Sequence, residues 1–318
     1  MTDEIAAGLR PPEPDFSTIT TEELIAYREA ENRARASKAA RAFLGEPDDS
    51  ALIDWRMIAL PGRDLPVRVY RPAVGGDVAL PLVVHVHGGC FVGTAVQCDW
   101  PNSILAARLP AVVVSVEHRL AAPGIALPDA AGDGWDTLVH VVRHAGEWGV
   151  DPERVAVVGE SYGGLISALT AVRSREAGPR LRAQVLVNPA VDVTESMYDY
   201  PSIAEYAYRP TRALPQLQLV QRLSAPPGVD AREWSPVRFD DLSGLPPALV
   251  VVPTRDALAD HGRRYAQRLR EAGTEVRLSE YPGARHGFLT LPGVEPQAAA
   301  AQAEISEFLR EALASTSI

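Results

Sequence analysis

Short aliphatic runs alternate with longer amphipathic segments through most of this 318-residue chain. A continuous Val, Ala and Leu run has no polar face, so a strand built from it must be buried on both sides. Strands that alternate with helices pair in parallel and take helices on both faces. The pattern therefore predicts an α/β fold with a mostly parallel sheet. The aliphatic runs are residues 82–87, 111–116, 155–158, 183–187 and 248–252, and the predicted helices among them are 129–145, 162–176 and 260–272.

Further strands extend this sheet to eight. Residues 53–60 and 66–71 alternate apolar with polar side chains, which indicates strands near a sheet edge. Residues 275–281 supply the last strand, and residues 297–314 form a closing helix. The edge strand near that helix is a candidate for pairing with a second copy, so a homodimer is a possible partner state.

Two segments fall outside the regular alternation. Residues 18–43 have helical character, and Gly45 and Pro47 end that helix. After Asp192 the pattern fails for about forty residues apart from a predicted helix at 215–223, and an irregular stretch of that length is usually functional. We predict that it forms a lid.

The charge and composition exclude several classes of partner. Acidic residues outnumber basic ones by 41 to 31, and no Lys or Arg run is present to neutralise nucleic-acid phosphates. Residues 1–10 carry acids without an apolar core, and no later run is long enough to span a membrane. We therefore expect a cytoplasmic protein with neither nucleic-acid nor membrane partners, and we expect Cys90 and Cys98 to be free thiols.

A Gly-Glu-Ser-Tyr-Gly peptide occupies residues 159–163, directly after one aliphatic run and at the start of a predicted helix. Such a motif arises by chance in many chains, but this strand-turn-helix context is what a nucleophile elbow requires. The two glycines are needed because a Cβ at either flank would clash with the strand or helix that the turn joins. Ser161 is the predicted nucleophile.

A second glycine pair follows the predicted strand at 82–87. In this position the backbone amides of Gly88 and Gly89 are able to stabilise a developing oxyanion, together with the amide of Tyr162. A plain turn is the alternative, and the serine motif downstream favours the oxyanion hole. His85 and His87 are interpreted as bracing residues rather than bases.

The remaining catalytic groups are sought after the nucleophile, in the order acid then base. Only His261 and His286 follow Ser161 as candidate bases. His286 lies in a Gly-flanked loop just past a strand, where ligands bind in open sheets, whereas His261 falls in a helix and is interpreted as a solvated residue. Asp256 precedes that helix in a loop and is the predicted acid, while Asp260 is interpreted as a helix-capping or first-turn acid.

Together these motifs resemble the hormone-sensitive-lipase-like branch of the α/β-hydrolases, also known as bacterial family IV esterases. Its characteristic segments correspond here, in the same order, to residues 87–90, 159–164, 256–260 and 286–288. The resemblance implies an α/β-hydrolase fold with a helical cap. The implied division is an N-terminal cap segment at 1–47, a core at 48–193, a cap insertion at 194–232 and the rest of the core at 233–318.

The sequence departs from the family pattern at three places. Cys90 replaces the third glycine of the oxyanion loop, and Tyr162 replaces a small residue beside the nucleophile. The family's usual Tyr-Arg-Leu-Ala-Pro segment is altered to His-Arg-Leu-Ala-Ala-Pro at 118–123. The family's substrate range therefore does not transfer directly to this chain.

The resulting hypothesis is a carboxylic ester hydrolase that uses a serine acyl-enzyme on short- to medium-chain acyl esters, acetyl esters included. We expect Cys90, Phe91, Glu160 and Phe288 to contact the substrate. No metal or organic cofactor is expected. A deacetylase, an amidase or an acyltransferase for a specialised metabolite would use the same groups, and a non-catalytic binder on the same scaffold is the alternative of another class.

Overall fold

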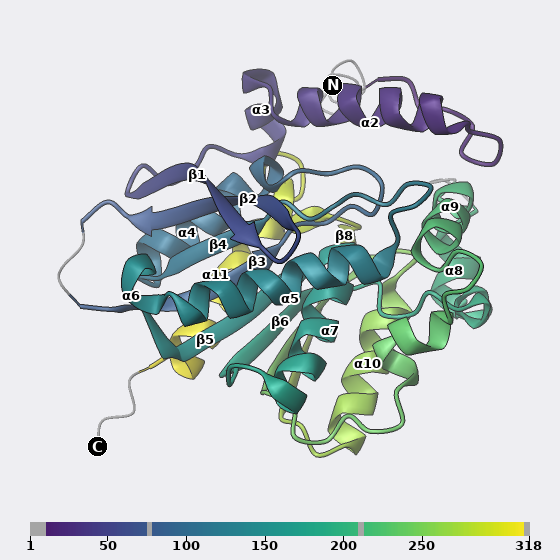
Figure 1. Ribbon diagram of the computed structural model, residues 1–318. Helices are drawn as coiled ribbons and strands as arrows, with labels where there is room; N and C mark the ends of the chain where they lie inside the picture. Colours follow the sequence, from purple (N-terminus) through teal and green to yellow (C-terminus); the bar gives the residue numbers. More distant parts are fainter. Residues whose placement is uncertain (1–10, 75–77, 209–212, 315–318) are drawn as a thin grey trace.

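The computed structural model describes residues 11–74, 78–208 and 213–314. Residues 1–10, on which part of the cytoplasmic prediction rests, lie outside these ranges, as do residues 209–212 of the predicted cap insertion. Within the described ranges a single sheet holds eight strands (Figure 1). The strands are β1 (Ala51–Leu60), β2 (Arg63–Pro72), β3 (Leu80–Val86), β4 (Val112–Val116), β5 (Val150–Glu160), β6 (Ala183–Val187), β7 (Ala248–Arg255) and β8 (Val276–Arg285).

The strand order is β1-β2-β4-β3-β5-β6-β7-β8. β1 and β2 are antiparallel, β2 is antiparallel to β4, and every later neighbour is parallel. The two strands with alternating sequence thus lie at one edge, and the continuous aliphatic strands lie inside, as predicted. β8 forms the opposite edge, so it is the strand to which the homodimer prediction refers.

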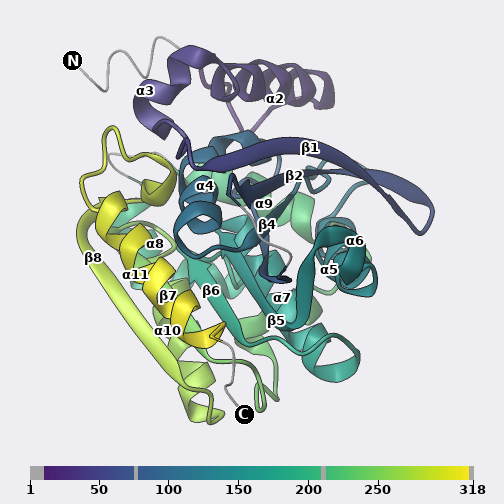
Figure 2. The same ribbon diagram turned by 90° about the vertical axis from the view of Figure 1, so that its left-hand side faces the viewer.

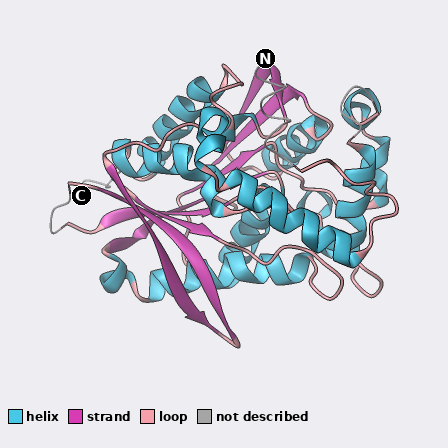
Figure 3. Cartoon of the chain, turned by 90° about the horizontal axis from the view of Figure 1, so that it is seen from above, coloured by secondary structure: helices cyan, strands magenta, loops and turns pink. Residues whose placement is uncertain are grey.

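Helices cover both faces of the sheet (Figures 2 and 3). On β3, Leu82 and Val84 pack into one apolar layer and Val83 into the other, because successive side chains of a strand point to opposite faces. α5, α7 and α10 contribute to the first face, and α4 and α11 to the second. The helices are α2 (Thr21–Arg35), α3 (Arg41–Leu44), α4 (Asp99–Arg108), α5 (Leu127–Arg143), α6 (Ala145–Trp148), α7 (Tyr162–Ala177), α8 (Pro201–Tyr206), α9 (Leu214–Ser224), α10 (Ala259–Glu271) and α11 (Ala298–Ala312).

Helix α4, which connects β3 to β4, is absent from the sequence prediction. Pro101 lies in its first turn, where the missing N–H has no intrahelical acceptor to lose. Seven of its ten residues are buried, on all sides of the helix. A helix without a polar stripe lacks the periodicity that reveals helices in sequence.

The predicted N-terminal helix is divided into separate pieces. Thr20 caps α2 with a capping box, in which its hydroxyl accepts from the Glu23 amide at 3.2 Å. α2 ends at Arg35 because the Ser37 side chain starts a new turn by accepting from Ala40 N at 3.3 Å. The positive φ of Gly45 then ends α3, as expected.

The N-terminal segment and helix α9 meet at one end of the sheet. Gln216 of α9 donates to Glu13 at 3.0 Å, and Arg222 of the same helix donates to the Phe16 carbonyl at 3.3 Å. Figure 1 shows α2 lying across this end and α8 and α9 beside it. None of the described helices combines the length and apolarity that a bilayer span needs.

Candidate active site

The turn between β5 and α7 holds Ser161 in a backbone conformation that few residues adopt. Its φ is 54° and its ψ is −116°. A Cβ on Gly159 would lie 2.2 Å from the Gly163 carbonyl oxygen, and one on Gly163 would lie 2.1 Å from the Val86 carbonyl oxygen. The flanking glycines are therefore required by close packing of the elbow against itself and against β3, for the reason that the sequence suggested.

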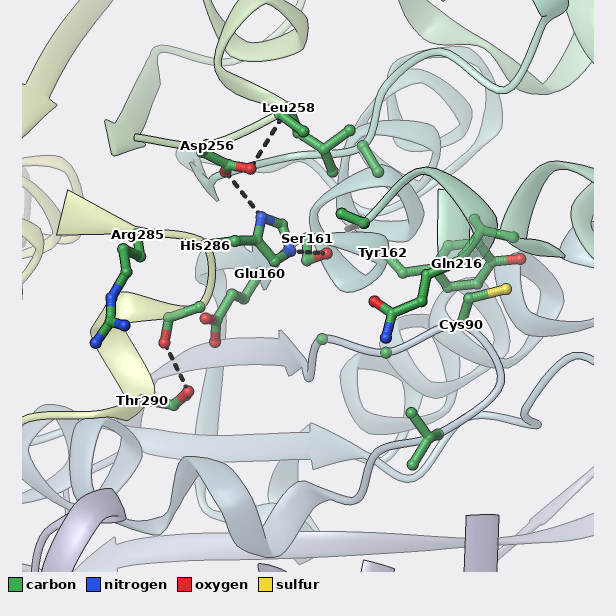
Figure 4. Close-up of a pocket in the computed structure, with 18 of the residues that line it drawn as sticks. Cys90, Glu160, Ser161, Tyr162, Gln216, Asp256, Leu258, Arg285, His286 and Thr290 are labelled. Carbon is green, nitrogen blue, oxygen red and sulfur yellow. Dashed lines mark hydrogen bonds and ion pairs between the residues drawn. The ribbon is translucent and has the colours of Figure 1, made fainter. Parts of the chain in front are cut away.

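Three side chains that are far apart in the sequence form a hydrogen-bonded chain. His286 Nε2 lies 2.8 Å from Ser161 Oγ, and His286 Nδ1 lies 2.8 Å from Asp256 Oδ2. Because a carboxylate only accepts, Nδ1 carries the proton and Nε2 accepts from the serine hydroxyl. Figure 4 shows the imidazole between the carboxylate and the hydroxyl.

The ends of two strands supply the imidazole and the carboxylate. Asp256 directly follows β7 and His286 directly follows β8, so both lie at the carboxyl edge of the sheet. Asp256 is 3% exposed, and its second oxygen accepts from the Leu258 amide at 2.9 Å. The carboxylate is thus fixed from both sides before any substrate arrives.

The loop after β3 lies against the elbow with unused amide groups. A Cβ on Gly88 would approach Ser161 Cβ to 3.5 Å, so this backbone is close to the hydroxyl. In the described part of the chain no protein group accepts a hydrogen bond from the amides of Gly88, Gly89 or Tyr162. The Tyr162 amide also lies at the N-terminus of α7, where the helix dipole favours negative charge.

A family profile described as the alpha/beta hydrolase fold matches residues 83–290, which is more than half of the chain. The chain belongs to the α/β-hydrolase fold family. The hormone-sensitive-lipase-like resemblance is confirmed with it.

Relatives of this α/β-hydrolase include named esterases. Carboxylesterase NlhH from Mycobacterium tuberculosis is 37% identical, with 82% of this chain and 83% of the relative covered. An ethyl acetate hydrolase from Pseudomonas putida is 30% identical, with 98% of each chain covered. The structure of an esterase from Pyrobaculum calidifontis superimposes with a TM-score of 0.84 at 30% identity and covers 98% of this chain and 99% of that one.

Electrostatics at the hydrolase site stabilise the imidazolium form of His286 relative to a free imidazole. Desolvation by the surrounding protein lowers the pKa of His286. The ion pair and hydrogen bond with Asp256 outweigh this effect, with a further contribution from the nearby Glu160 carboxylate, and the pKa is raised above its ordinary 6.5. The ring still has 41% of its side-chain surface open toward the cavity. Burial raises the pKa of Glu160 to about 7 against the opposing effects of His286 and Arg35.

The prediction that His261 is a solvated helix residue is wrong. His261 is fully buried, because it shares one face of α10 with Tyr265 and Leu269 at helical spacing. Its ring meets the edge of Tyr200 with centroids 5.1 Å apart, and neither ring nitrogen has a partner among the described residues. Burial lowers its pKa to about 4, so His261 is neutral and is not bonded to Ser161.

A cavity of about 630 Å³ opens above Ser161. Its wall includes three of the predicted substrate contacts: Cys90, Phe91 and Glu160. Phe288 does not line it, which corrects the prediction: the 3₁₀ turn Phe288–Thr290 turns the fully buried ring against Tyr281, with centroids 5.4 Å apart. Further parts of the wall come from α2, α3 and α9, and from the segments after β6, β7 and β8.

Two buried histidines pack beside the loop after β3. The rings of His87 and His118 stack with centroids 4.3 Å apart, and burial lowers both pKa values to about 4. His118 Nε2 lies 3.3 Å from the His87 carbonyl oxygen. Both rings pack there as neutral groups; the sequence interpretation assigned a bracing role to His85 and His87 and did not include His118. Across the described ranges, no three His, Cys, Asp or Glu side chains are grouped closely enough to hold a metal ion.

Proposed function

We propose that this α/β-hydrolase is a carboxylic ester hydrolase in which Ser161, His286 and Asp256 form the catalytic triad. The observation that carries the proposal is the continuous chain of two 2.8 Å hydrogen bonds from Asp256 through the imidazole to the serine hydroxyl. That geometry prepares the serine for attack without further rearrangement.

The mechanism is a two-step acyl transfer. Ser161 Oγ bonds to the ester carbonyl carbon while its proton moves to His286 Nε2, and the new oxyanion accepts hydrogen bonds from the amides of Gly88, Gly89 and Tyr162. The carbonyl reforms as the alcohol leaves with the proton from His286. Water then repeats the sequence on the acyl-enzyme and releases the acid, with Asp256 stabilising the imidazolium each time.

The cavity over the triad supports a cap role for two segments. Side chains of Glu31 and Arg35 from α2, and of Leu217 and Val220 from α9, line it. We assign residues 1–47 and 194–232 to a cap that encloses small ester substrates and excludes bulk water, between core segments at 48–193 and 233–318. The contact between Gln216 and Glu13 joins the two cap segments.

Bulky residues beside the nucleophile favour a short acyl group. Tyr162 and Cys90, which replace smaller residues of the family pattern, are 2% and 4% exposed and form adjoining parts of the wall. Ser224 at the end of α9 donates to the Tyr162 hydroxyl at 3.3 Å and lies 3.8 Å from Cys90 Sγ. Figure 4 shows Cys90 and Tyr162 on the side of Ser161 away from Arg285. The Pseudomonas putida relative, named for ethyl acetate, agrees with this assignment.

We expect the purified protein to hydrolyse p-nitrophenyl acetate and butyrate faster than p-nitrophenyl octanoate. The packed Tyr162 and Cys90 side chains leave less room for a long acyl chain, and each misfitting methylene costs about 1–3 kcal/mol in a pocket of fixed shape. Initial rates of p-nitrophenolate release across the series measure this. No hydrolysis of any of these esters would exclude the proposed function, and a rate that climbs steadily with chain length would contradict the acyl preference.

The same series of p-nitrophenyl esters tests whether the Tyr162 and Cys90 side chains limit the length of the acyl group. Tyr162→Ala combined with Cys90→Gly should raise the octanoate-to-acetate ratio of kcat/KM about tenfold. Tyr162→Phe is the matched control, since it keeps the ring and removes only the hydroxyl, and its ratio should stay near that of the wild type. An unchanged ratio in the enlarged double variant would remove these side chains from acyl selection.

Glu160 should shift the acid limb of the pH profile, which His286 sets. His286 must be neutral to accept the serine proton, so kcat/KM falls as the pH drops through its raised pKa. Glu160 carries its negative charge above its pKa of about 7, where it favours the imidazolium; Glu160→Gln removes that charge, so the limb should move to lower pH. Rates on p-nitrophenyl acetate from about pH 5 to about pH 9 measure it. Glu153→Gln, on the exposed surface, is the control; a limb that stays in place or moves upward in Glu160→Gln would contradict the assignment.

A further inference from the structure

One face of helix α2 is bonded to the loop that carries the oxyanion amides. Arg28, Asn32 and Arg35 are spaced by four and three residues, which places them on the same side of the helix. The loop, residues 88–93, has no strand or helix of its own. Backbone of this kind needs outside partners to keep one conformation, because few of its groups pair with one another.

Asn32 binds Gly93 through both of its polar atoms. Asn32 Nδ2 donates to the Gly93 carbonyl at 2.9 Å, and its Oδ1 accepts from the Gly93 amide, also at 2.9 Å. The side chain thereby pairs with this residue as a neighbouring strand would. Both groups of Gly93 are fixed in position and direction.

Arg28 joins the same loop to the segment that contains Ala121. Its Nε donates to the Phe91 carbonyl at 2.7 Å, and one terminal nitrogen donates to the Ala121 carbonyl at 2.6 Å. Ala121 in turn donates to the Cys90 carbonyl at 2.8 Å. A planar guanidinium suits two divergent carbonyls because its donors are held in a rigid fork.

These contacts reach the oxyanion amides through tight backbone packing. A Cβ on Gly93, whose φ is +144°, would lie 2.4 Å from the Gly88 carbonyl oxygen, and one on Gly89, whose φ is +114°, would lie 1.7 Å from the Val92 carbonyl oxygen. The ends of the loop are therefore folded against each other. A shift of Gly93 must move Gly88, since no free space separates them.

Arg35 provides a second connection to the same carbonyl. It donates to Gln97 Oε1 at 2.7 Å, and Gln97 Nε2 donates to the Gly88 carbonyl at 3.1 Å. The peptide group that contains the Gly89 amide is thus held by a side-chain relay from the helix. Both routes from α2 end at the backbone that would face the substrate oxygen.

We propose that α2 positions the oxyanion hole, with Asn32 and Arg28 as its main positioning residues. The inference rests on the proposed ester hydrolysis and assigns the helix a role in the transition state beyond covering the substrate. Oxyanion stabilisation requires donors aimed at an atom that becomes charged only during the reaction. Loosening the loop therefore lowers kcat and leaves substrate binding nearly unchanged.

The test compares Asn32→Ala and Arg28→Lys with the wild type on p-nitrophenyl acetate. Alanine is the better helix former, so the first variant does not weaken α2 itself. Lysine keeps the charge of Arg28 but reaches only one of the two carbonyls. We expect kcat to fall about tenfold or more in each variant, against the 10²- to 10³-fold loss typical of a deleted donor, with KM within about twofold. Inhibition by a trifluoromethyl ketone, whose serine adduct places an oxyanion in the hole, should weaken in parallel.

Arg33→Ala is the matched control on the exposed face of the same helix. Its side chain is 71% exposed, and its guanidinium pairs with Glu29 at 3.6 Å, a contact of little energetic weight. It should match the wild type in every assay. If both test variants keep the wild-type kcat, or lose efficiency through KM alone, the inference is overturned. Should Asn32→Ala fail to fold, Arg28→Lys decides the question. An inactive wild type would instead refute the proposed function.

Discussion

Ser161→Ala should lower kcat on p-nitrophenyl acetate about 10⁶-fold, because among the described residues Ser161 is the nucleophile whose oxygen is hydrogen-bonded to His286 Nε2. The substitution removes one oxygen and keeps the Cβ, so the strained φ of 54° and the packing of the elbow are unchanged. A remnant of about 10³- to 10⁴-fold over the reaction in water should persist, since the oxyanion amides and His286 remain in place. The rate of p-nitrophenolate release, corrected for spontaneous hydrolysis, measures both quantities.

Covalent labelling of the serine distinguishes the loss of the nucleophile from misfolding of the Ser161→Ala variant. A fluorophosphonate should add one mass equivalent to the wild type and none to Ser161→Ala. Thermal unfolding should differ little, since the lost hydroxyl contributes about 1 kcal/mol through its hydrogen bond to His286. Ser243→Ala, at an exposed turn, should keep both rate and label. Equal rates for Ser161→Ala and the wild type would remove Ser161 from the mechanism, and an unlabelled wild type would favour a binding protein.

Local requirements made the elbow predictable. Gly159 and Gly163 lie where a Cβ would be about 2 Å from backbone oxygens. Only glycine fits at these two positions, so the motif itself indicates the geometry of the turn. His286 and Asp256 were found from their positions after predicted strands, because the carboxyl ends of parallel strands meet at one edge. Sequence order and topology together therefore brought out the three groups that the structure places within hydrogen-bond distance.

The errors concern side chains whose surroundings come from tertiary packing. His261 carries a polar ring in a helix rich in charged residues, but it lies on the face that Tyr265 and Leu269 pack against the sheet. Phe288 is close to His286 in sequence, and the intervening positive φ of Gly287 turns it into the core. Neither side-chain orientation can be predicted from hydrophobic periodicity or from a sequence motif.

The role inferred for α2 illustrates the same limit. Its capping box and helical spacing can be recognised in the sequence. No local pattern shows that Asn32 is hydrogen-bonded to Gly93, which is sixty-one residues away. Helix α4 is hidden for another reason, since burial on all sides removes the stripe on which helix prediction depends. Long-range pairing and complete burial are the features that required coordinates.

Asp256→Asn should lower kcat about 10⁴-fold with little change in fold. In the wild type one carboxylate oxygen accepts from the Leu258 amide and the other from His286 Nδ1, at 2.9 and 2.8 Å. An asparagine has one accepting oxygen, and the fixed amide of Leu258 claims it. Its NH₂ group must then face Nδ1, which obliges the ring to carry its proton on Nε2. That tautomer donates toward Ser161 and cannot accept the serine proton.

The loss is this large because the Leu258 amide fixes the orientation of the asparagine side chain and so determines which of its groups faces His286. The Leu258 amide is backbone at the start of α10 and is unable to reverse, whereas the imidazole exchanges its tautomer freely. Asp260→Asn is the matched control four residues along the chain: its carboxylate pairs with Arg263 at 3.0 Å, away from the triad, so kcat should stay near the wild-type value. Steady-state rates and thermal unfolding of both variants decide the matter. If Asp256→Asn lost no more activity than Asp260→Asn, the carboxylate would not control the tautomer of His286, and the base would have to be oriented by another group.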